Sequence, residues 1–309
     1  MESAAACRIP PRNHHFIPQY FLKAWQHAEG KIFRYRRLPS SGAMEIKSVA
    51  IKRTASIQDL YRINFPDGGF EVESSHVTPL IDEAGHKIIK KARGSSVQNW
   101  EIPDRRQLAN TLTSLEARHP DILKVMDVRS ALDPLRQKIK AEKHFSHKSV
   151  DELIDYFKGS DSLGVISLVL HTQNELLPLI AQPFSDGLLQ ASMREYSYER
   201  SCLLCSDYPT SRWGDYLKDL LFIIAISPDK ALVFSNNPAI VVFDLLKPHA
   251  RARLINLYTL GKAQTAYYCD GAQGEFVSAH LGWALTRPDI SDQRQYVQDF
   301  LLAEDAWHH

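Results

Sequence analysis

Two adjacent histidines, His14 and His15, stand directly before an aromatic-rich run in the segment NHHFIPQYFLKAW, residues 13–25. An imidazole with a pKa of about 6.5 can act as a general base or a metal ligand near neutral pH. Neighbouring side chains on an extended segment point to opposite sides, so we expect only one of the two to face a cleft. In the structural alternative, a neutral imidazole hydrogen-bonds a backbone carbonyl and holds the N-terminal segment in place.

Asp207 is the next candidate, in the sequence CSDYP. It follows an apolar run and precedes Pro209 by two residues, where a strand gives way to a surface loop. Catalytic groups are frequent at such positions. Aspartate also initiates turns by accepting hydrogen bonds from backbone N–H groups, so the same pattern arises without any activity.

Arg118, in EARHP, is the third candidate. A guanidinium near the end of a helix can bind a phosphate or a carboxylate through two parallel hydrogen bonds. It can also form a buried ion pair with an acidic residue of the protein, such as Asp207 or Glu73, and this is the commoner outcome.

Other spacings that resemble site motifs are weaker. His144 and His147 are three residues apart but lack the acidic companion of an H-E-x-x-H zinc motif. Cys202 and Cys205 match C-x-x-C, yet the leucines between them favour a buried strand over a zinc site. The chain has no G-x-S-x-G, P-loop or G-x-G-x-x-G motif, which argues against the common serine hydrolases, NTPases and dinucleotide enzymes.

The composition is that of a soluble protein with balanced charge. With 37 Lys+Arg against 36 Asp+Glu in 309 residues, no overall field attracts nucleic acid or an anionic membrane. A nucleic-acid partner would need a local patch, and the basic-aromatic run IFRYRR instead has the alternation of a half-buried strand. No apolar run approaches the roughly 20 residues of a membrane helix, and the first 15 residues lack the apolar core of a secretory signal. We therefore expect a cytoplasmic protein with no membrane contact.

The residue patterns predict both helices and strands. A helix from 18 to 27 places Phe21, Leu22 and Trp25 on one face, and we expect this face to pack against helices between residues 73 and 126. KIFRYRR and EIKSVAIKR predict a hairpin over 31–53. The other predicted elements are strands in SCLLCSDYP, LLFIIAISPD and KALVF, and a final helix over RARLINLYTLGKAQTAYY.

Strands do not alternate regularly with helices, so we expect an α+β fold, predominantly helical, with one small antiparallel sheet built from residues 31–53 and 202–242. We expect a mobile N-terminal arm, a single α+β domain that includes a charged helical insert, and a disordered tail; their bounds are residues 1–12, 13–303, 127–160 and 304–309.

The order of several motifs resembles the domain of unknown function 4238 (DUF4238) family. The motifs are NHHFIPQYFLKAW, GKIFRYRR, an acidic helix start at Glu73, RHP, CSDYP, ISPDKALVF and INLYTLGKAQTAYY. The resemblance implies a His-His-x-x-Pro element, an Arg-x-Pro in a helix, a Ser-Asp-x-Pro at a strand end, and a second acidic helical position that aligns with Asp82. It implies candidate positions and no activity.

Two functional hypotheses follow. In the first, His14 or His15 converges with Asp207, Arg118 and Glu73 on a hydrolytic site for phosphodiesters, with a divalent metal as candidate cofactor. In the alternative, these residues form an internal polar network and the protein binds another macromolecule without catalysis. Exposure separates the two, because a site must reach solvent and a structural network need not.

Overall fold

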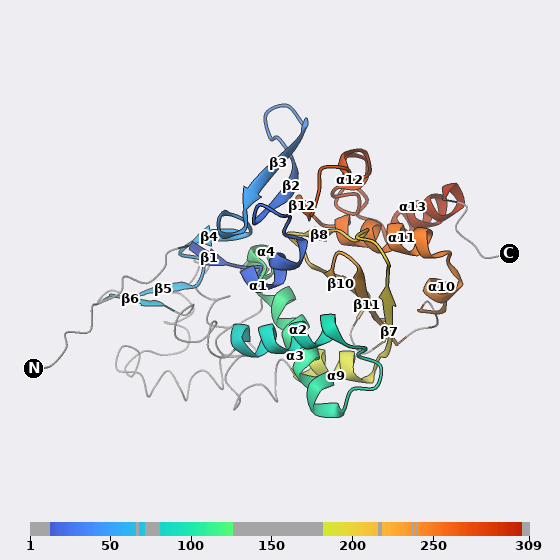
Figure 1. The fold of residues 1–309 in the computed structure, drawn as a ribbon, viewed down its shortest axis with the longest axis horizontal. Helices are drawn as coiled ribbons and strands as arrows, with labels where there is room; N and C mark the ends of the chain where they lie inside the picture. Colours follow the sequence, from blue (N-terminus) through green and yellow to red (C-terminus); the bar gives the residue numbers. More distant parts are fainter. Residues whose placement is uncertain are drawn as a thin grey trace, which may run out of the picture.

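A computed structural model describes residues 13–65, 68–71, 81–125, 182–215, 218–236, 238 and 240–304. Helices and strands do not alternate regularly, and the described strands pair antiparallel, so the expected α+β class is confirmed (Figure 1). Helical residues outnumber strand residues in this part of the chain. The predicted single small sheet needs correction, because the described strands form two four-stranded sheets and two two-stranded pairs, all antiparallel.

One four-stranded sheet lies between helices. Its order is β7 (Ser192–Ser197), β11 (Lys230–Ser235), β10 (Leu221–Ser227) and β9 (Thr210–Trp213). Every residue of β10 and β11 is buried, and β10 contacts both α2 (Glu83–Gly94) and α11 (Pro248–Leu260). Continuous apolar runs, rather than alternating ones, are what a strand buried on both faces requires. The strands predicted in LLFIIAISPD and KALVF are confirmed as β10 and β11, and the structure pairs them with each other.

The other four-stranded sheet has the order β3 (Met44–Ala50), β2 (Lys31–Arg37), β12 (Thr265–Tyr268) and β8 (Cys205–Ser206). The β2–β3 hairpin is confirmed. The helix predicted over RARLINLYTLGKAQTAYY is wrong in its second half. Helix α11 ends at Leu260, and TAYY, rich in strand-favouring residues, pairs with β2.

The N-terminal segment begins with β1 (Asn13–His15), which pairs with β4 (Ser56–Gln58). The helix predicted over 18–27 is shorter, consisting of α1 (Gln19–Leu22) and the 3₁₀ turn η1 (Lys23–Trp25). Its apolar face is buried as expected, and α1 contacts α2. Trp25 donates its indole N–H to the carbonyl of Leu203 at 2.8 Å.

The remaining helices cover the two sheets, with α2, α3 and α9 grouped on one side and α11, α12 and α13 on another (Figure 1). The bounds of the remaining helices and strands are η2 (Ile51–Arg53), β5 (Arg62–Phe65), β6 (Gly68–Glu71), α2 (Glu83–Gly94), α3 (Ile102–Ala117), α4 (Pro120–Val125), α9 (Gln182–Gln190), α10 (Ile240–Leu245), α11 (Pro248–Leu260), α12 (Gly274–His280) and α13 (Ile290–Ala303).

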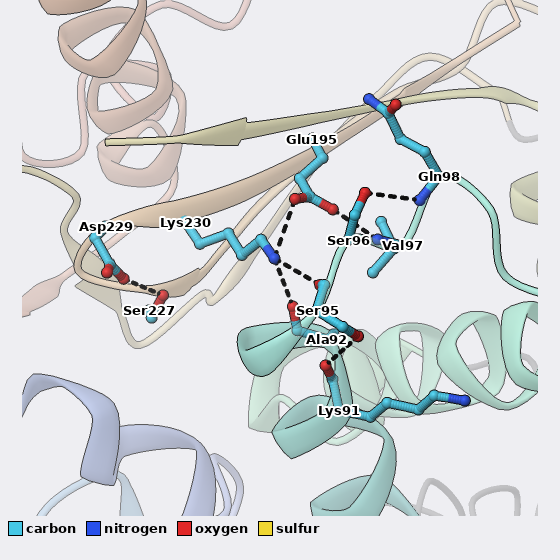
Figure 2. A network of polar contacts seen from close by, with 10 residues as sticks. All are labelled: Lys91, Ala92, Ser95, Ser96, Val97, Gln98, Glu195, Ser227, Asp229 and Lys230. Atoms are coloured by element: carbon cyan, nitrogen blue, oxygen red, sulfur yellow. Dashed lines mark hydrogen bonds and ion pairs between the residues drawn. The ribbon is translucent and has the colours of Figure 1, made fainter. Parts of the chain in front are cut away.

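A buried lysine joins the end of α2 to the first sheet (Figure 2). Lys230 donates to the carbonyls of Ala92 and Ser95 at 2.9 and 2.7 Å and pairs with Glu195 at 3.1 Å. The other carboxylate oxygen of Glu195 accepts the Val97 N–H at 2.7 Å. The last carbonyls of α2 are therefore satisfied by a side chain of β11.

One connected cluster of buried apolar side chains includes residues of both four-stranded sheets and extends from Phe16 to Leu301. The strand predicted in SCLLCSDYP is limited to β8; Leu203 and Leu204 are fully buried but precede it. The predicted arm 1–12 and insert 127–160 lie outside the described residues, and so does the predicted tail 304–309 except for Glu304, the C-cap of α13. Within the described part, no helix is long and apolar enough to cross a membrane.

Candidate functional site

His14 and His15 point to different surroundings from β1, as expected for neighbours on a strand. His14 is fully buried, and its Nδ1 accepts the Tyr61 backbone N–H at 2.8 Å. The two rings lie parallel with centroids 5.6 Å apart. His14 therefore serves to hold the chain around Tyr61 against β1.

Arg118 connects the surrounding elements. It caps the C-terminus of α3 and is fully buried. Its guanidinium donates from Nη1 to Asp82 Oδ1 at 2.5 Å and from Nη2 to the His15 carbonyl at 2.8 Å, and Nε faces the Tyr61 hydroxyl at 3.3 Å. The ion pair with Asp82 neutralises a charge that would otherwise be costly to bury. The Asp82 side chain keeps 18 % of its surface exposed, so the pair reaches the edge of the protein.

His15 has an unsatisfied nitrogen beside this ion pair. Its Nε2 is buried and has no hydrogen-bond partner among the described residues. Burial lowers the pKa of His15 below 6.5; a hydrogen bond to the Lys52 backbone opposes this effect, and the Arg118 charge adds to it. The imidazole is therefore mostly neutral at pH 7, the form that can accept a proton.

Tyr20 provides a second unsatisfied atom. Its hydroxyl is also buried without a partner in the described chain. Burial raises the pKa of Tyr20, and the nearby Asp82 charge raises it further, so the phenol stays protonated. Gly85 on α2 faces this hydroxyl, and a Cβ at that position would collide with it. Glycine at 85 thus allows α2 to approach the Tyr20 side chain closely.

These four residues, His15, Tyr20, Asp82 and Arg118, are called the Asp82–Arg118 site below. His15 and Tyr20 both interact electrostatically with the ion pair. The charge nearby is positive, because the Arg93 guanidinium also acts on Tyr20. Arg93 donates to the carbonyls of Tyr20, Phe21 and Ile226, and burial lowers its pKa only to about 10, so it is charged at pH 7.

Asp207 is held by other groups. Its carboxylate accepts the Gln264 backbone N–H at 3.1 and 3.3 Å, and its own N–H donates to the Thr265 carbonyl at 2.9 Å. Burial raises the pKa of Asp207 to about 7, because these backbone hydrogen bonds offset only part of the desolvation. The residue bridges the β8–β12 junction as a turn aspartate does.

A short chain of ring contacts leads from Asp207 toward the Asp82–Arg118 site. Tyr208 stacks on His119, the residue after Arg118, and His119 contacts Phe16, the residue after His15. The neighbour of Asp207 in sequence thus contacts neighbours of the site residues, and Asp82 is the acid that pairs with Arg118.

Two features that the sequence suggests lie wholly outside the described residues. Glu73 is one, and the pair His144 and His147 is another. Among the residues that the structure describes, no group of three or more His, Cys, Asp or Glu side chains is arranged to hold a metal ion.

Comparison with protein families decides the classification. A family model described as "Protein of unknown function (DUF4238)" matches residues 13–268. The chain belongs to the DUF4238 family. The match begins at β1 and ends at β12, so the DUF4238 segment contains every residue of the Asp82–Arg118 site, while α12 and α13 follow it. No curated protein and no solved structure matches the chain.

Sequence reasoning placed His15 and Arg118 among the candidates of this DUF4238 chain and missed Tyr20. The family resemblance indicates Asp82 only as an acidic position in a helix. The sequence does contain a signal for Tyr20. It is an aromatic residue with a hydroxyl, it lies next to the apolar face formed by Phe21, Leu22 and Trp25, and it follows His15 by five residues. Nothing in the sequence near Gly85 indicates that its missing side chain makes room for a hydroxyl 65 residues earlier.

Proposed function

We propose that this DUF4238 protein is a hydrolase of phosphodiesters that uses the Asp82–Arg118 site. The observation that carries the proposal is the presence of two buried polar atoms, His15 Nε2 and the Tyr20 hydroxyl, without partners beside one ion pair. An unsatisfied buried polar group costs about 1–3 kcal/mol. A bound substrate and its attacking water would supply the missing hydrogen bonds.

His15 is the general base in this mechanism. Its neutral imidazole takes a proton through Nε2 from a water molecule as the water attacks phosphorus and the bond from phosphorus to the leaving oxygen breaks. The leaving oxygen then takes a proton from solvent, and the imidazolium releases its proton to solvent. The lowered pKa keeps the base available at neutral pH, and the Lys52 backbone orients the ring. A positioned base of this kind contributes about 10²–10⁴-fold to a rate.

Tyr20 and the arginines stabilise negative charge. The Tyr20 hydroxyl, kept protonated by its raised pKa, donates a hydrogen bond to a phosphoryl oxygen. The positive charges of Arg93 and Arg118 lower the pKa of this hydroxyl, and the negative charge of Asp82 raises it. The resulting positive potential favours an anionic substrate and strengthens as charge develops in the transition state.

A divalent metal remains a candidate cofactor of the proposed hydrolase. The described residues offer His15 Nε2 and the partly exposed carboxylate of Asp82, while Glu73 lies outside them. The steps above therefore rest on the protein's own acid and base groups, and the metal content of purified protein tests the metal-dependent form.

The alternative function, binding of a macromolecule without catalysis, has support from a different observation. His14 and Arg118 are fully buried and bonded to backbone groups and side chains of the protein, as members of a structural network are. In this case the network holds β1, α2 and α3 together and the partner binds elsewhere.

The test compares His15→Gln with His27→Gln. His27 is a matched control, because it is a partly buried histidine that hydrogen-bonds Ser48 on the β2–β3 hairpin. With bis(4-nitrophenyl) phosphate as the substrate, His15→Gln should lower kcat by about 10²–10⁴-fold at an unchanged melting temperature, and His27→Gln should keep wild-type activity.

The wild-type rate should also rise with pH through a pKa below 6.5 and then reach a plateau, because the base must be deprotonated. Absence of hydrolysis by the wild type, with His15→Gln less stable than His27→Gln, would instead support the structural network.

A further inference from the structure

A second pair of unsatisfied polar atoms lies on different elements. The Tyr198 hydroxyl and the Arg251 Nε are buried and have no hydrogen-bond partner among the described residues. Tyr198 follows the last residue of β7, and Arg251 lies in the first turns of α11. Both residues are only partly buried, so these atoms lie close beneath the surface.

The Arg251 guanidinium is held in place without a carboxylate. It lies over the Tyr196 ring at 4.5 Å from the centroid and donates from Nη2 to the Leu246 carbonyl at 2.9 Å. Asp244 contacts the same tyrosine, but its oxygens accept from the Tyr196 hydroxyl at 2.7 Å and from Arg194 at 3.0 Å. No salt bridge between Arg251 and an acidic residue occurs in the described chain.

Tyr198 extends the same surface. Tyr198 lies one residue beyond β7, but the β7–β11 pairing continues through its N–H, so we expect its side chain on the face on which Tyr196 packs against Arg251. The backbone N–H of Tyr198 donates to the Asp229 carbonyl at 2.8 Å, which fixes its main chain. Burial raises the pKa of Tyr198, and the Arg251 charge opposes that rise.

The other group that faces Tyr198 is the Cys202 thiol, whose pKa is raised to about 11 by burial. The thiol is therefore neutral at pH 7, and no carboxylate is among the groups that shift the pKa of Tyr198. Of the two groups that act on the Tyr198 hydroxyl, Arg251 is the one that is charged at pH 7.

We propose that Tyr198 and Arg251 together bind a small oxyanion, the phosphate or carboxylate group of a ligand. Arg251 Nε can only donate a hydrogen bond, and the Tyr198 hydroxyl can donate a second one to the same acceptor. An oxyanion supplies several acceptor oxygens and the counter-charge that the guanidinium lacks. The fixed backbone of Tyr198 and the stacking of Arg251 on Tyr196 keep both donors in place before the ligand arrives.

This site is independent of the proposed hydrolase. It is built from β7 and α11, whereas the Asp82–Arg118 site is built from β1, α1, the start of α2 and the end of α3. It would hold an anionic group of a regulator or of a second ligand, and its existence does not require hydrolysis at His15.

Isothermal titration with inorganic phosphate, and separately with acetate, measures this binding at constant ionic strength. Wild type should bind at least one of the two anions. Tyr198→Phe keeps the ring and removes the hydroxyl, and it should weaken that binding at least about tenfold, the loss expected for one hydrogen bond to a charged group. Arg251→Met should abolish it.

Two control variants separate this site from other sources of binding. Arg194→Met removes a neighbouring guanidinium that is already paired with Asp244, and it should leave the affinity unchanged. Arg287→Met removes a guanidinium that lies over another tyrosine ring, that of Tyr296, and it should also leave the affinity unchanged. Phosphate binding alone identifies a phosphate group, and equal binding of acetate identifies a carboxylate-type oxyanion. Binding of neither anion, or binding that Tyr198→Phe leaves intact, would overturn the proposal.

Discussion

The side chains of Asp207 and His15 differ in whether their polar atoms have hydrogen-bond partners. Asp207 has backbone donors for its carboxylate, whereas His15 has a backbone partner and a second nitrogen without one. Both pKa values are shifted toward the uncharged form by burial. The shift has different consequences, because the neutral imidazole is a base and the neutral carboxyl group is not.

The stability of the protein should depend on pH through Asp207. Its folded-state pKa of about 7 lies above its ordinary value of 3.8, so the folded state favours the protonated form. The contribution to stability is fully present below about pH 4 and is lost as pH rises through 7. The loss for a shift of this size is on the order of a few kcal/mol.

Asp207→Asn tests this dependence. Asparagine can still accept the Gln264 N–H through its side-chain oxygen and carries no charge, so the variant should lose less stability than the wild type between pH 5 and pH 8. Urea unfolding at the two pH values measures the difference, with Asp299→Asn, an exposed carboxylate on α13, as the control. Equal pH dependence in wild type and Asp207→Asn would mean that the carboxylate is ionised at neutral pH.

The junction between helix α2 and the β7–β11 strand pair depends on one lysine. The Lys230 ammonium and the Glu195 carboxylate are nearly buried, with 9 % and 11 % of their side chains exposed, and between them they satisfy three backbone groups (Figure 2). Removal of one charge leaves the other without its partner.

Lys230→Met should therefore destabilise the protein by about 3–5 kcal/mol in urea unfolding. The double variant Lys230→Met/Glu195→Gln should recover part of this loss, because glutamine can still accept the Val97 N–H without a buried charge. A loss under about 1 kcal/mol in the single variant would show that the pair adds little to the attachment of α2.

Trp25 connects the N-terminal part of the described chain with its C-terminal half through a long-range contact. It is fully buried in the cluster that connects the sheets, and its indole N–H donates to a carbonyl 178 residues away. Because this contact closes a long stretch of chain, we expect its loss to affect global unfolding rather than local fraying.

Trp25→Ala should lower the free energy of unfolding by about 3–5 kcal/mol, as expected for a large buried side chain. Trp25→Phe keeps most of the apolar volume and loses only the bond to Leu203, so its cost should be smaller. Chemical denaturation measured by circular dichroism compares the two. A small loss in Trp25→Ala, or a loss of similar size in both variants, would contradict this role.

Local residue patterns predict those features of the protein that depend on neighbours a few residues away. The alternation in KIFRYRR predicted β2 and its hairpin, the apolar runs predicted β10 and β11, and adjacency predicted the divergence of His14 and His15. The order of motifs also indicated the DUF4238 family. Each of these follows from backbone geometry or from residue order, which the sequence contains directly.

Contacts between side chains that are far apart in the sequence depend on how the helices and strands pack. Arg118 could pair with any buried carboxylate, and packing of the α3 end against α2 selects Asp82, 36 residues earlier. The same packing places the Tyr20 hydroxyl over Gly85, and pairing with β2 makes a strand of TAYY. These contacts depend on how whole elements are oriented, and local residue preferences do not distinguish among the alternatives because each one satisfies them equally well.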